Sequence, residues 1–162
     1  MSKVCSESTS DESRCRESVQ YIAVKFDDRT PGTSGEGLGS IMEYTRLGNS
    51  DLNVSRICLG TVFRSEPDEA SSIAAIHQAA ELGCNYLDCA NVYRDGLSEK
   101  IVGRAVRGRR AQFIISTKVG SPEADVPASG GLSRNEIMRA AETSLRRLDT
   151  DYLDTYLCHF PD

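Results

Sequence analysis

Four side chains capable of acid–base chemistry stand at or just beyond the carboxyl ends of short apolar segments. They are a carboxylate, a phenol, an ammonium and an imidazole: Asp88, Tyr93, Lys118 and His159. Each one taken alone has an ordinary structural explanation, such as a turn cap, a packed ring, an exposed strand end or a core histidine. In a parallel barrel the carboxyl ends of all strands meet at one rim. In that arrangement, we expect the four side chains to lie close together at this rim, which is the mouth of the barrel.

Together, the four types of side chain suit the reduction of a carbonyl group by hydride, which needs a proton donor at the developing alkoxide. A free phenol, whose reference pKa is about 10, is a poor donor near neutrality. A neighbouring ammonium stabilises the phenolate, so we expect Lys118 to activate Tyr93 as the donor. We expect Asp88 to hold Lys118 charged and His159 to donate a hydrogen bond to the substrate oxygen.

Strand-like and helix-like segments alternate along the chain from residue 56. The predicted strands are 56–61, 85–88, 112–118 and 151–159, and the predicted helices are 65–83, 98–106 and 133–148. Such alternation with short links is typical of a parallel α/β sheet, either a barrel or a doubly wound fold. Upstream, Gly48 and Asn49 separate two short runs of strand formers in residues 42–55, which predicts a β-hairpin.

Serine residues stand where each predicted helix begins. Ser65, with Asp68 downstream, is predicted to cap the first helix. Ser98 is predicted to cap the second helix. Ser133 and Glu136 have the spacing of a capping box at the start of the third.

Composition and charge exclude several classes of function. The formal net charge is −5, so no nucleic-acid surface is expected, and no apolar stretch is long enough to cross a bilayer. The sequence has neither the apolar core of a secretory signal nor the composition of a transit peptide, which predicts a cytoplasmic protein. The six cysteines include no CxxC pair and predict reduced thiols without a metal site. One basic cluster follows a predicted helix and is interpreted as a solvated face: Arg104, Arg107, Arg109 and Arg110.

Residues 1–41 differ in composition from the rest of the chain. They are rich in serine and acidic residues and poor in large apolar ones, which predicts a disordered tail. The glycine run GTSGEGLGS follows a turn-like segment rather than a strand, so it indicates a flexible linker and not a phosphate-binding loop. The folded domain is therefore predicted over residues 42–162.

Four motifs occur in order and with appropriate spacing: MEYTRLGNSDLNVSRICLGT, GCNYLDCANVYRDGLSEKIVGRAV, FIISTKVG and SLRRLDTDYLDTYLCHFPD. They resemble the amino-terminal half of an aldo-keto reductase. The resemblance implies a TIM (β/α)₈ barrel with an amino-terminal hairpin, truncated after the fourth strand. It also implies an oxidoreductase that uses NADPH to reduce aldehydes or ketones, or oxidises sugars or alcohols, by hydride transfer.

The resemblance carries over to individual residues by motif. Asp88, Tyr93, Lys118 and His159 match the family's catalytic tetrad, with Tyr93 as the general acid. The expected cofactor-binding residues are Gly60, Thr61 and Asp88. The expected partners are a small carbonyl or sugar substrate, with no nucleic acid and no membrane.

The matching segment, residues 42–162, accounts for half of a barrel that usually takes about 250 residues. We therefore expect the first and fourth strands to have unpaired edges, which favours self-association. The alternative to a working enzyme is a catalytically inactive fragment, or a regulatory or binding subunit of the same fold.

Overall fold

The structure, a computed structural model, describes residues 20–22, 42–64, 68–124 and 126–161. Its strands are β1 (Gln20–Ile22), β2 (Tyr44–Arg46), β3 (Asn53–Ser55), β4 (Ile57–Gly60), β5 (Tyr86–Asp88), β6 (Ile114–Val119) and β7 (Thr155–Cys158). Its α-helices are α1 (Glu69–Glu81), α2 (Leu97–Ala105) and α3 (Arg134–Leu148), and a short 3₁₀ helix covers Arg110–Gln112. From β4 onward strands and helices alternate, as the sequence predicts.

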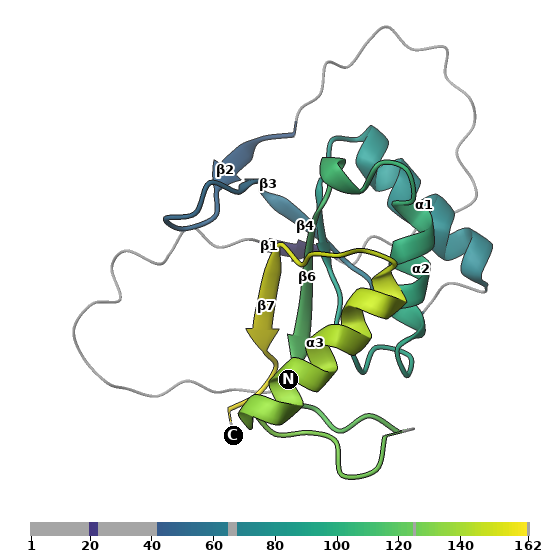
Figure 1. The fold of residues 1–162 in the computed structure, drawn as a ribbon. Coiled ribbons are helices and arrows are strands. Elements are labelled where there is room, and N and C mark those ends of the chain that lie inside the picture. The colour runs from purple at the N-terminus through teal and green to yellow at the C-terminus, as the bar shows by residue number, and fades with distance from the viewer. Residues whose placement is uncertain (1–19, 23–41, 65–67, 125, 162) are drawn as a thin grey trace, which may run out of the picture.

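One parallel sheet, in the order β1-β4-β5-β6-β7, forms the centre of the fold. β2 and β3 make a separate antiparallel hairpin. Figure 1 shows the three helices together on one side of the sheet, and the hairpin near the ends at which β6 and β7 begin. The predicted α/β class and the predicted hairpin are confirmed, and the arrangement is that of part of a parallel barrel.

Successive residues of each strand point to opposite faces of the sheet. The face toward the helices carries Leu59, Leu87 and Ile115, which belong to one apolar cluster with residues of all three helices. On the other face, near the start of the strands, Cys58, Tyr86 and Ile114 form a second cluster with Val54 of the hairpin. Both faces are therefore apolar at the end of the sheet where the hairpin lies.

Two of the helices begin at polar caps. α1 follows Asp68, whose carboxylate accepts a hydrogen bond from the Ser71 amide at 2.7 Å. The predicted cap, Ser65, lies outside the described residues, and the N-cap of α1 is Asp68 instead. α3 begins as predicted, because the Ser133 hydroxyl accepts a hydrogen bond from the Glu136 amide. In the described part of the chain, no helix is long and apolar enough to cross a membrane.

α2 begins differently from the prediction. Its N-cap is Gly96, which has a left-handed backbone and no capping side chain. Ser98 lies in the first turn, fully buried, and its hydroxyl donates to the Thr61 carbonyl at 2.6 Å. The prediction that Ser98 caps α2 is wrong because this hydroxyl instead fastens the helix to the segment after β4.

β1 lies within the segment predicted to be a disordered tail. It pairs in parallel with β4, so that Gln20 is opposite Ile57 and Ile22 is opposite Leu59. The prediction of an unpaired edge on β4 is therefore wrong. The rest of residues 1–41 lies outside the described residues, and the prediction of a tail there stays a prediction. At the other side of the sheet, β7 has no strand on its outer edge within the described residues.

Helices α2 and α3 approach each other closely at Gly103. A Cβ atom built at Gly103 would lie 2.5 Å from the carbonyl oxygen and 2.7 Å from the carbonyl carbon of Leu148. These are backbone atoms at the end of α3, and they cannot move aside as a flexible side chain could. Glycine is therefore required here for contact between the helices rather than for backbone freedom.

We predict that Gly103→Ala lowers the free energy of unfolding by about 2 kcal/mol, because the added methyl group forces the helices apart. This is opposite to the usual stabilising effect of replacing glycine by alanine inside a helix. The measurement is urea denaturation followed by circular dichroism. Gly60→Ala is the matched control, since a Cβ atom there would meet no atom within 4 Å. Equal stability of Gly103→Ala and the unmodified chain would contradict the close packing.

Candidate active site

Asp88 and Lys118 are brought to the same face of the sheet by the register of its central strands. Asp88, the last residue of β5, is opposite Gly60 on one side and Ser116 on the other. Lys118 follows Ser116 by two residues on β6, and therefore points to the same face as Ser116. This face is apolar near the hairpin and polar at the carboxyl ends of the strands.

Lys118 is held by three acceptors. Its Nζ donates to Asp88 Oδ1 at 2.7 Å, to the Cys89 carbonyl at 2.7 Å and to the Tyr93 hydroxyl at 3.3 Å. Burial works to lower the pKa of Lys118, but the hydrogen bond and the negative charge of Asp88 outweigh it, with a smaller contribution from Tyr93. The pKa therefore lies above the ordinary lysine value, and the side chain is an ammonium at neutral pH.

Tyr93 lies in the loop between β5 and α2. Three consecutive residues after it, Arg94, Asp95 and Gly96, have positive φ angles of 51°, 54° and 81°. Such angles are uncommon for residues other than glycine, and here they turn the chain abruptly into α2. The turn leaves the phenol over Lys118, whose Nζ is 4.9 Å from the centre of the ring.

His159 directly follows β7 and continues its pairing with β6, since its amide donates to the Val119 carbonyl at 2.7 Å. Its ring meets the Tyr93 ring edge-on, with 5.8 Å between centroids, and stacks on the Phe160 ring with 4.6 Å between centroids. Nδ1 lies 3.4 Å from the Ser121 hydroxyl. Burial, assisted by the charge of Lys118, holds the pKa of His159 below its ordinary value despite an opposing effect of Asp88.

The structure therefore brings together all four side chains that the sequence places at strand ends. A buried carboxylate holds an ammonium, the ammonium contacts a phenol, and a neutral imidazole lies beside that phenol. Such a set can deliver a proton to an oxygen atom and stabilise the phenolate that remains. Within the described residues, no cluster of His, Cys, Asp and Glu could hold a metal ion.

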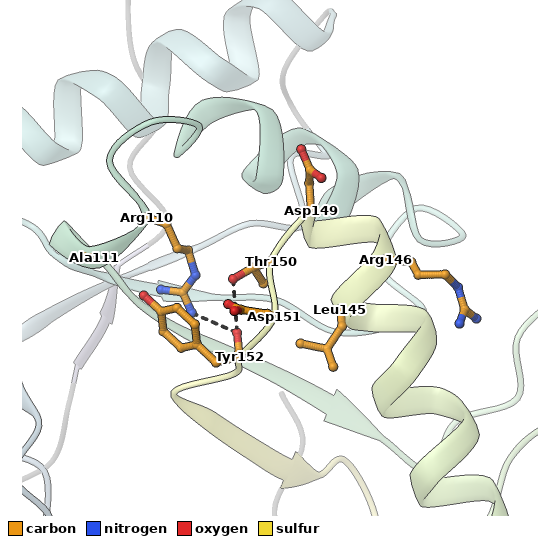
Figure 2. A pocket seen from close by; sticks show the side chains of 8 residues that line it. All are labelled: Arg110, Ala111, Leu145, Arg146, Asp149, Thr150, Asp151 and Tyr152. Carbon is orange, nitrogen blue, oxygen red and sulfur yellow. Dashed lines mark hydrogen bonds between the residues drawn. The ribbon is translucent and has the colours of Figure 1, made fainter.

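A groove of about 770 Å³ lies elsewhere, near the amino ends of β6 and β7. Figure 2 shows Arg110 and Tyr152 close together on its wall. The Arg110 guanidinium lies 4.0 Å from the centre of the Tyr152 ring and 2.6 Å from Asp154 Oδ2. Arg110 is largely buried, so its interpretation as part of a solvated face is wrong. These contacts tie the 3₁₀ turn to the segment before β7, at the opposite end of the strands from Asp88.

Relatives found by sequence and relatives found by fold belong to one family of proteins. A family model described as the aldo/keto reductase family matches residues 56–162. The chain belongs to the aldo/keto reductase family. Aldo-keto reductase YhdN of Bacillus subtilis is 38% identical over 128 residues. The probable voltage-gated potassium channel subunit beta of Arabidopsis thaliana is also 38% identical over 128 residues.

Among solved structures, aldo-keto reductase AKR11C1 from Bacillus halodurans in its holo form superposes with a TM-score of 0.66 and 39% identity, covering 72% of this chain and 40% of that one. The two curated relatives match 75% of this chain, but only 38% and 39% of their own lengths. This aldo/keto reductase chain thus spans about two fifths of the length of the relatives it matches.

The residues at the mouth fit the nicotinamide cofactor that the family implies. Gly60 is exposed next to Asp88 in the sheet, and a Cβ atom there would meet nothing within 4 Å, so a flat ring has open space beside the carboxylate. Thr61 is placed differently. Its hydroxyl is fully buried and donates to the Asp88 carbonyl at 2.9 Å, so it supports Asp88 from behind.

The buried ionic contacts behind the mouth do not follow from the sequence patterns. Glu99 is fully buried in the first turn of α2 and accepts a hydrogen bond from the Thr117 hydroxyl at 2.6 Å. Arg147 contacts both Glu99 and Glu123. The sequence carries a weak signal for this arrangement, because Glu99 precedes Ile101 and Val102 on a short helix with a strongly apolar face. Its partners are distant in sequence and could not be identified from spacing.

We predict that Lys118→Met raises the pKa of His159, because it removes the positive charge that disfavours the imidazolium while Asp88 remains. The sequence contains two histidines, so the His159 signal can be assigned in an NMR pH titration by mutating His77. Lys100→Met is the matched control, since Lys100 is exposed on α2. An unchanged or lower pKa of His159 in Lys118→Met would contradict the arrangement.

Proposed function

We propose that the protein acts as an NADPH-dependent aldo-keto reductase, which reduces aldehydes or ketones and in reverse oxidises sugars or alcohols. The observation that carries the proposal is the contact of one buried ammonium with both a carboxylate and a phenol: Lys118 with Asp88 and Tyr93. Membership of the aldo/keto reductase family supports it.

The bound nicotinamide would supply the hydride. The chain's own residues then handle the proton. As the carbonyl oxygen gains negative charge, Tyr93 donates its hydroxyl proton to that oxygen, and Lys118 stabilises the phenolate that remains. Asp88 keeps Lys118 charged and in place. Nδ1 of the neutral His159 ring faces the Ser121 hydroxyl. In the tautomer that carries its proton on Nε2, Nδ1 accepts from Ser121 and Nε2 donates a hydrogen bond to the same oxygen.

The buried position of the pair supports this role. Asp88 is 6% exposed and Lys118 is 9% exposed. In such an environment the ammonium acts on the phenolate with little screening by water. The Cys89 thiol, in the apolar cluster on the helix side of the sheet, is also buried, which raises its pKa to about 12, so it stays neutral.

A second candidate is a regulatory or binding subunit of the same fold. The name of the plant relative, a probable voltage-gated potassium channel subunit beta, favours it. In that case the contact of Lys118 with Asp88 and Tyr93 would serve cofactor binding or stability rather than turnover. The two candidates differ in whether Tyr93 is needed for chemistry.

We predict that Tyr93→Phe lowers the rate of NADPH oxidation with benzaldehyde or glyceraldehyde by roughly a hundredfold or more, because the proton donor is lost while the ring remains. The measurement is the decrease in NADPH absorbance under saturating cofactor. Tyr152→Phe is the matched control, since its ring is 40% exposed and lies in the groove at the other end of the strands.

Wild-type activity in Tyr93→Phe would overturn the assignment of the proton donor. A folded chain that binds NADPH, measured by fluorescence titration, without oxidising it with either aldehyde would instead support the regulatory candidate. Turnover that depends on Tyr93 but not on Tyr152 is the result that the reductase proposal requires.

A further inference from the structure

Arg147, near the end of α3, lies behind the loops that form the mouth, with its side chain only 15% exposed. Its Nη1 donates to the Asn91 carbonyl at 3.0 Å and to Glu99 Oε2 at 3.3 Å. Its Nη2 lies 2.8 Å from Glu123 Oε2. One guanidinium therefore contacts the loop after β5, the first turn of α2 and the loop after β6.

Both carboxylates at Arg147 are deeply buried, since the side chain of Glu99 is 0% exposed and that of Glu123 is 4% exposed. A buried carboxylate without a cation is strongly destabilising. Glu123 has a second partner in Arg139, at 2.6 Å, whereas Glu99 pairs with Arg147 alone among the described residues. A side chain at Gly96 would overlap the guanidinium, so the left-handed glycine before α2 also makes room for it.

Each partner of Arg147 is close, in sequence or through a hydrogen bond, to a residue of the candidate active site. Asn91 precedes Tyr93 by two residues, and its backbone amide donates to the Lys118 carbonyl at 3.4 Å. Glu99 accepts a hydrogen bond from Thr117, the neighbour of Lys118 on β6. Glu123 follows Ser121, the residue that contacts His159, by two positions.

We propose that Arg147 is a positioning residue that fixes the Tyr93 loop against β6, so that the phenol stays within reach of the Lys118 ammonium. The proposal rests on the proposed reductase function for its effect on turnover. Its geometric content is independent of turnover, because the position of the Tyr93 ring relative to Lys118 can be observed directly.

The experiment uses the full chain, three variants at or near Arg147, and Lys118→Met as a reference. Arg147→Met combined with Glu99→Gln and Glu123→Gln removes the guanidinium without leaving a buried carboxylate unpaired, and the amide that replaces the Glu99 carboxylate can still accept from Thr117. Arg147→Lys keeps the charge but loses the planar guanidinium, whose two terminal nitrogens are spread far enough apart to contact three segments at once. Arg146→Met is the matched control, because this neighbouring arginine is exposed and donates only to the Thr143 hydroxyl among the described residues.

The first readout is ¹⁹F NMR of 3-fluorotyrosine placed at position 93, with Lys118→Met as the reference for a ring that has lost its ammonium. In the triple variant we expect the resonance to broaden or to move toward the Lys118→Met position while the melting temperature stays close to wild type. The second readout is NADPH oxidation with benzaldehyde. We expect kcat to fall by on the order of tenfold to a hundredfold with little change in KM for NADPH, and Arg147→Lys to recover part of the loss.

A wild-type ¹⁹F resonance in the triple variant would overturn the proposal. The proposal would also be overturned if the change in the resonance increased with the loss of melting temperature in every variant, Arg146→Met included. Such a correlation would show a general structural effect. An altered resonance in the triple variant, with no turnover in any chain including wild type, would uphold the positioning of Tyr93 and count against the reductase function.

Discussion

The candidate site depends on one interaction, the buried ion pair between Lys118 and Asp88. An ammonium at 9% exposure is unfavourable unless acceptors surround it, and here a carboxylate, a carbonyl and a phenol provide them. The pair fixes the protonation state of Lys118 and the direction of its side chain. It also requires β5 and β6 to keep their register, since a shift by one residue would turn either side chain to the opposite face.

The rest of the sheet surrounds the ion pair with apolar packing. The hairpin covers one end of the sheet face opposite the helices with apolar contacts, and the helices cover the other face. In the described strands of this sheet the charged residues, Asp88 and Lys118, lie toward the carboxyl ends. Gly103 lets α2 approach α3 closely enough for Arg147 to pass behind the mouth and contact Glu99. Lys118 thus contacts the Tyr93 hydroxyl at the mouth, and Arg147 contacts the same loop at the Asn91 carbonyl.

Features that depend on local pattern could be predicted from the sequence. The alternation of strands and helices, the hairpin and the Ser133 cap follow from periodicity and turn residues, and the convergence of Asp88 and Lys118 follows from the parallel order of the strands. Ser98 and Arg110 were misjudged because their partners, Thr61 and Asp154, are distant in sequence. A hydroxyl or guanidinium has the same local signal whether it faces water or a buried acceptor. For the same reason, the contacts of Arg147 could not be found before the fold was known.

Asp88 keeps Lys118 charged inside the site. The most direct measurement is the pKa of Lys118, from the ¹³Cε chemical shift of labelled lysine followed through the alkaline range, in the unmodified chain and in Asp88→Asn. We expect the pKa of Lys118 to lie above the ordinary lysine value in the unmodified chain. We expect a lower pKa in Asp88→Asn, where burial is no longer offset by the carboxylate. A Lys118 that titrates like an exposed lysine, or identically in both chains, would contradict the account.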